Sequence, residues 1–135
     1  MTNPYFLSSS EQLRLEITAC DAVVVVKLND TQLLKVEKKD VPVKTMLTKG
    51  MKRSDKSMTH CLEIFLEGKP YEHSIEAAIY SLDSSGEALA IKTFKEKKSQ
   101  EALKEKNISE YYLQLVQPKP SEKNVWIGKF YFQFD

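Results

Sequence analysis

The chain has 135 residues, of which 41% are hydrophobic and 29% are charged, and its 20 Lys and Arg nearly balance 19 Asp and Glu, for a formal net charge of +1. These values are typical of a single globular domain over residues 1–135 and exclude a disordered acidic chain. The near-neutral total also lacks the strong basic field of nucleic-acid-binding proteins, so we expect no nucleic-acid partner.

The first ten residues contain no basic segment and no apolar run of signal-peptide length. The longest apolar run, residues 22–26, is far shorter than the ~20 residues of a membrane-spanning helix. We therefore expect a cytoplasmic protein with no membrane partner. Its two cysteines, Cys20 and Cys61, do not indicate a disulfide scaffold, and two reduced thiols are expected, with a single bridge between strands as the alternative.

Apolar and polar residues alternate with period two along most of the chain, which predicts β-strands. In the first third, strands are expected over residues 13–19, 22–28 and 31–36, and the turn at Asn29 and Asp30 joins the last two into a hairpin. Residues 37–57 break this alternation and predict a long loop. Pro42 supports a loop or a sheet edge there, because it has no N–H to donate.

The remaining strands are expected over residues 58–67, 74–82, 87–95, 111–117 and 125–134. One short helix is predicted over residues 99–106, where Ser99 can cap its first turn. Gly128 marks a place in the last strand where a neighbour approaches closely. The apolar faces of two strands should form the core with six large side chains: Leu62, Ile64, Leu66, Trp126, Phe130 and Phe132.

About eight strands and one short helix predict an all-β fold, an antiparallel β-sandwich. Residues 23–67 resemble the galactose-binding-like jelly-roll sandwich in three segments, which read VVVVKLND, VPVKTMLTKG and CLEIFLEG. The resemblance implies a jelly-roll arrangement of the strands. The chain departs from the family at Asp30, where glycine is usual, and matches none of its ligand residues, so no site is transferred.

The sequence contains no phosphate-binding glycine loop, no nucleophile elbow and no metal-binding motif. His60 and Cys61 are neighbours in a predicted strand, so their side chains should point to opposite faces. They are therefore unsuited to share a metal ion or to act as a nucleophile and its base. We expect a protein that is not an enzyme and that has no cofactor and no metal.

Charge is distributed unevenly along the chain. Residues 38–56 carry seven Lys and Arg against two Asp, a local charge of +5, whereas residues 62–91 carry −5. A long basic loop favours an acidic partner, and five residues are the candidate binding residues: Lys49, Met51, Lys52, Arg53 and Lys56. The alternative is that these lysines only keep an irregular connection soluble.

Two functions fit these observations. The first is a non-catalytic protein-binding module of the inhibitor, immunity or assembly type, which engages an acidic partner surface through the basic loop. The alternative is a carbohydrate-binding β-sandwich module, in which exposed aromatic side chains such as that of Tyr131 stack against sugar rings.

Overall fold

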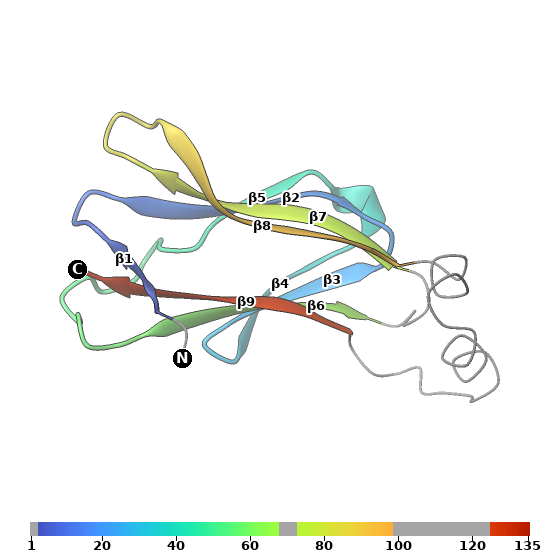
Figure 1. The fold of residues 1–135 in the computed structure, drawn as a ribbon, viewed down its shortest axis with the longest axis horizontal. Helices are drawn as coiled ribbons and strands as arrows, with labels where there is room; N and C mark the ends of the chain where they lie inside the picture. Colours follow the sequence, from blue (N-terminus) through green and yellow to red (C-terminus); the bar gives the residue numbers. More distant parts are fainter. Residues whose placement is uncertain (1–2, 68–72, 99–124) are drawn as a thin grey trace.

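The computed structural model describes residues 3–67, 73–98 and 125–135, and these residues form two facing β-sheets (Figure 1). The five-stranded sheet consists, in spatial order, of β1 (Tyr5–Leu7), β9 (Val125–Phe134), β6 (His60–Glu67), β3 (Val23–Leu28) and β4 (Thr31–Val36). The four-stranded sheet consists of β5 (Val43–Met46), β2 (Gln12–Cys20), β7 (His73–Leu82) and β8 (Ala88–Lys98). A single 3-10 turn, η1 (Lys38–Asp40), precedes β5. The predicted all-β sandwich is confirmed.

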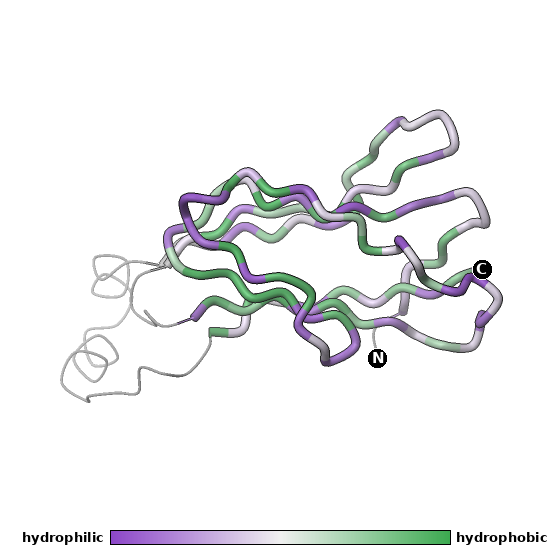
Figure 2. Tube along the Cα trace, turned by 180° about the vertical axis from the view of Figure 1, so that it is seen from behind, coloured by the Kyte–Doolittle hydropathy of each residue, from purple (hydrophilic) through white to green (hydrophobic). Residues whose placement is uncertain are grey.

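Within the described ranges, neighbouring strands are antiparallel except β1 and β9, which run parallel. The predicted hairpin of β3 and β4 is confirmed, and Asn29 and Asp30 adopt the positive φ angles, 53° and 66°, that its tight turn requires. Figure 2 shows hydrophobic residues along both sheets, interrupted by hydrophilic ones, as alternation produces. The predicted helix at 99–106 and strand at 111–117 lie outside the described residues.

The prediction of one continuous loop over residues 37–57 is wrong. Residues 37–57 contain η1 and the edge strand β5, which pairs only with β2 among the described strands. The four residues of β5 are too few for alternation to stand out, and Pro42 directly before them marks the sheet edge. The three-residue strand β1 escapes sequence analysis for the same reason.

The core lies between the sheets and is built by alternate residues of the central strands. Leu62, Ile64 and Leu66 of β6 are fully buried, as predicted, and face buried residues of β2 such as Leu15 and Ile17. Full burial of a side chain of this size contributes about 1.5–3 kcal/mol. Cys20 is buried within this core, Cys61 is half-buried, and both thiols are free.

The prediction that Trp126 of β9 points into the core is wrong, because its side chain is 52% exposed. Ile64 pairs with Gly128 but Phe65 pairs with Trp126, so Ile127 is an extra residue in β9. This β-bulge reverses the alternation and places Trp126 on the outer face. Phe132, beyond the bulge, is fully buried as predicted, whereas Phe130 is only partly buried.

Candidate functional site

The connection between β5 and β6, residues 47–59, follows a path fixed by hydrogen bonds to the sandwich. Leu47 is buried and donates its backbone N–H to the Leu13 carbonyl at 2.8 Å. The buried Thr48 hydroxyl donates to Gln12 Oε1 at 2.5 Å, and Gln133 Nε2 donates to the Lys56 carbonyl at 2.6 Å. The connection is therefore anchored near both of its ends.

The side chain of Arg53 makes its contacts within the protein itself. Its guanidinium donates to the carbonyls of Ser8 and Glu11, at 3.2 and 2.5 Å, and its carbon Cζ lies 5.0 Å from the centre of the Phe134 ring. Arg53 thus joins the β5–β6 connection to the turn between β1 and β2. Met51 is half-buried against the core.

The remaining three candidate residues, Lys49, Lys52 and Lys56, are exposed. We call them the lysine surface. The other basic residues of 38–56 lie elsewhere, since Figure 1 shows η1 at the opposite end of the sandwich from the β5–β6 connection. The local charge of +5 is therefore divided between two ends of the molecule, because β5 runs between them.

A carboxylate lies beside the Arg53 contacts. Glu11 accepts hydrogen bonds from the hydroxyls of Tyr5 and Ser81 and from the Ser8 backbone N–H. Burial acts to raise the pKa of Glu11, but the hydrogen bonds from Ser81, Tyr5 and Ser8 outweigh it, and the net pKa is lowered. This ionised carboxylate holds β1, the following turn and β7 together.

His60 is buried, and its ring stacks on Phe132 with centroids 5.1 Å apart. Asn29 Oδ1 accepts the Cys61 backbone N–H at 2.9 Å, so its amide Nδ2 donates to His60 Nδ1 at 2.9 Å. Burial lowers the pKa of His60, and Nε2 has no hydrogen-bond partner in the described part of the chain. His60 and Cys61 lie on opposite faces of β6, as predicted. Among the residues described, no group of three or more His, Cys, Asp or Glu side chains is placed so that it could hold a metal ion.

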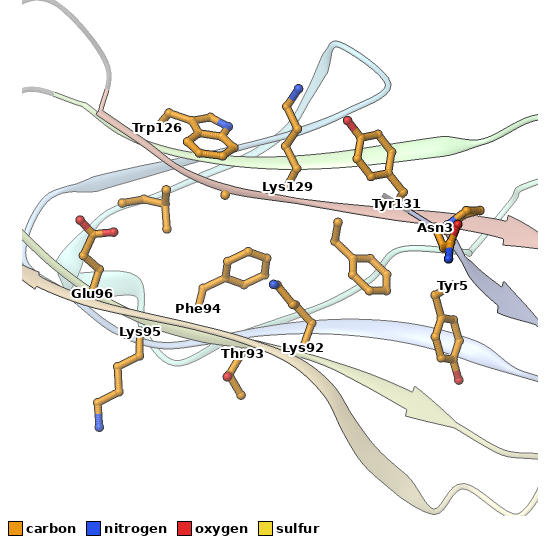
Figure 3. Close-up of a pocket in the computed structure, with 14 residues that line it drawn as sticks. Asn3, Tyr5, Lys92, Thr93, Phe94, Lys95, Glu96, Trp126, Lys129 and Tyr131 are labelled. Carbon is orange, nitrogen blue, oxygen red and sulfur yellow. The ribbon is translucent and has the colours of Figure 1, made fainter. Parts of the chain in front are cut away.

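A groove of about 800 Å³ lies between β8 and β9 (Figure 3), and nothing in the sequence pattern predicts it. β8 is one of the two edge strands of the four-stranded sheet, and β1 pairs with β9 only at residues 132–134. In the ranges that the structure describes, residues 125–131 of β9 therefore have no strand on the side away from β6. We call residues 125–131 the free edge of β9.

Phe94 and Gly128 bring the two sheets together inside this groove. The buried Phe94 ring reaches across from β8, and a Cβ atom on Gly128 would lie only 2.8 Å from Phe94 Cε1. The close approach predicted at Gly128 is confirmed. Around this contact the groove has an apolar lining that includes Ile127 and Phe130.

Charged residues of the groove come from both strands. Figure 3 shows Lys92 and Glu96 pointing from β8 toward β9, and the Lys92 ammonium lies 5.6 Å from the Phe94 ring centre. Lys129 projects from the outer face of β9, 3.8 Å from the Glu63 carboxylate. The neighbouring Tyr131 and Glu63 raise the pKa of Lys129, so it stays cationic at neutral pH.

No family model matches the chain, and neither the curated proteins nor the solved structures contain a match. The resemblance to galactose-binding-like sandwiches therefore stays a prediction. The described part of the chain contains no helix of the length and apolarity that crossing a membrane requires.

Proposed function

We propose that this chain is a non-catalytic protein-binding module that contacts an acidic partner through the lysine surface. The observation that supports the proposal is the fixed course of the β5–β6 connection. Leu47, Thr48 and Arg53 bind it to the sandwich, while Lys49, Lys52 and Lys56 remain exposed.

A connection that is ordered before binding loses less conformational entropy when a partner arrives. Exposed charges on such a connection accelerate encounter with a surface of opposite charge, and salt screens the effect over about 8–10 Å at physiological ionic strength. The Arg53 contacts therefore refine the interpretation of the basic loop: Arg53 positions the lysines and does not itself meet the partner.

The test replaces Lys49, Lys52 and Lys56 together by Glu. A matched control replaces Lys38, Lys39 and Lys44, which are also exposed, and changes the net charge equally. Proteins are captured from native cell extract with wild type and both variants, and association rates of a captured partner are measured at two salt concentrations. We expect association about tenfold slower for the first variant, with wild-type rates falling in salt. Equal rates for both variants would contradict the proposal.

One observation favours carbohydrate binding as a second candidate. Trp126 is 52% exposed and pairs across the strands with Phe65, which in turn pairs with Val25. These cross-strand pairs place the exposed indole of Trp126 on the outer face of the five-stranded sheet, where a sugar ring can stack. Titration with soluble oligosaccharides should then change the emission of Trp126, the single tryptophan. Unchanged emission across neutral, acidic and amino sugars would eliminate this candidate.

A further inference from the structure

Among the described residues, the free edge of β9 has no strand paired to it on the side away from β6, which is the arrangement that an added strand requires. Residues 125–131 pair with β6 on one side, and within the described ranges β1 covers only residues 132–134 on the other. Seven residues slightly exceed the usual strand length of about five or six. The groove beside this edge leaves room for side chains of an incoming strand.

β8, the opposite wall, is protected against strand addition. Lys92 pairs with Ile79 and Glu96 pairs with Ile75. Because Ile79 and Ile75 are buried, these two charged residues of β8 lie on the face of the strand that is turned toward the other sheet. Inward-pointing charges at an edge disfavour pairing with another strand. The free edge of β9 carries one charged residue, Lys129, and its side chain lies on the outer face (Figure 3). Of the two strands, β9 is therefore the one that can pair with an added strand.

The two faces of an added strand would meet different neighbours. On the groove side lie the apolar Ile127 and Phe130 together with the Lys92 ammonium and, toward Trp126, the side chain of Glu96. On the outer side lies Lys129. Side chains that alternate along a strand could thus present apolar groups and a carboxylate to the groove and a second carboxylate to Lys129. The lysines that flank the free edge favour an acidic occupant.

We propose that the free edge of β9 binds an extended acidic peptide segment of a partner protein as an additional β-strand. Main-chain hydrogen bonds to β9 hold the segment, and Lys92 and Lys129 select for its carboxylates. The free edge of β9 shares no residue with the lysine surface. Peptide binding at β9 therefore goes beyond the proposed function, and either proposal can be wrong while the other holds.

The first measurement concerns the free protein. Amide hydrogen exchange in the full chain should be fast for those N–H groups of residues 125–131 that point away from β6. Slow exchange at these amides would show that the edge is already covered, and would overturn the proposal. Sedimentation should give a monomer at the same concentration, because a dimer formed through β9 would identify a second copy as the occupant.

The second measurement uses a heptapeptide with blocked ends and the sequence Val-Thr-Val-Glu-Glu-Thr-Val. As a strand it presents valines and one glutamate to one face and a second glutamate to the other. We expect shifts of amide resonances confined to the residues of the groove and its two strands, together with a change in Trp126 emission. Three control peptides define the binding mode. A peptide with lysine in place of glutamate should not bind, and N-methylation of the amides that face β9 should abolish binding whereas N-methylation of the others should not.

Two protein variants test the role of charge. Lys92→Glu should weaken binding about two- to fivefold, the contribution of a surface ion pair. Lys44→Glu, on the other edge strand of the same sheet, should leave it unchanged. Native amide spectra of both variants verify folding. Equal affinities for the two variants, binding insensitive to N-methylation, or shifts centred on Lys49, Lys52 and Lys56 would each overturn the proposal.

Discussion

At the scale of single residues, Arg53 shows how a side chain that looks like a ligand contact can be structural. Nothing in the local sequence distinguishes it from the neighbouring Lys52, because its partners Ser8 and Glu11 are more than forty residues away. Sequence periodicity identifies which residues share a face of a strand. It carries no information on which distant carbonyls a side chain in an irregular connection will reach.

Replacing Arg53 by Ala should lower the free energy of unfolding by about 1–3 kcal/mol, because hydrogen bonds from a cation and a ring contact are lost. Lys52→Ala, at an exposed neighbour, should stay within about 0.5 kcal/mol of wild type. Urea denaturation measures both variants. Equal losses would show that the Arg53 contacts do not stabilise the fold.

Glu11 makes the free energy of unfolding depend on pH in the acidic range. Its folded pKa lies below the 4.5 of a free glutamate, so its stabilisation is fully present above that pH and is lost as pH falls through the folded pKa. Wild type should therefore lose more stability than Glu11→Gln when urea denaturation is repeated at about pH 3 instead of pH 7. Parallel losses in the two proteins would contradict the assignment.

His60 should titrate below the 6.5 of a free histidine, because burial disfavours its charged form. Protonation of Nδ1 would also set a donor against the Asn29 amide. Stability should accordingly decline as pH falls from about 6.5 through the folded pKa. The ring protons of His60, followed by NMR, report the midpoint directly, and a midpoint at or above 6.5 would refute the prediction.

At the scale of elements, alternation was sufficient to locate seven of the nine strands described, and the bounds of β4 and β9 match the predicted ones. It failed where strands are very short, as in β1 and β5, since three or four residues do not establish a period. It also failed inside β9, because the bulge at Ile127 changes which residues face the core without changing the sequence pattern. The groove depends on which strands become edges, and periodicity does not determine strand order.

The bulge leads to a stability contrast between two aromatic residues of one strand. Trp126→Ala should cost less than about 1 kcal/mol, since half of the side chain is already exposed. Phe132→Ala, at a fully buried position, should cost about 3–5 kcal/mol. Urea denaturation followed by circular dichroism measures both. Similar losses would mean that Trp126 is packed as deeply as Phe132.

At the scale of the whole molecule, the Phe94 and Gly128 contact holds the two sheets together on the side where β8 and β9 leave a groove. Gly128→Ala should lower the free energy of unfolding by about 1–3 kcal/mol, because the new methyl group would overlap the Phe94 ring. Phe94→Leu made in the same chain should recover part of that loss, which a double-mutant cycle quantifies. Additive losses would show that the overlap is relieved elsewhere.

The parallel pair of β1 and β9 also determines how the domain responds to mechanical load. Tyr5 lies opposite Phe132 and Leu7 opposite Phe134, and the Asp135 backbone N–H donates to the Leu7 carbonyl. Tension applied between residues 3 and 135 pulls β1 and β9 in opposite directions along a shared axis. Their hydrogen bonds are then loaded in shear and must rupture together, whereas an antiparallel terminal pair gripped at adjacent ends would peel apart one bond at a time.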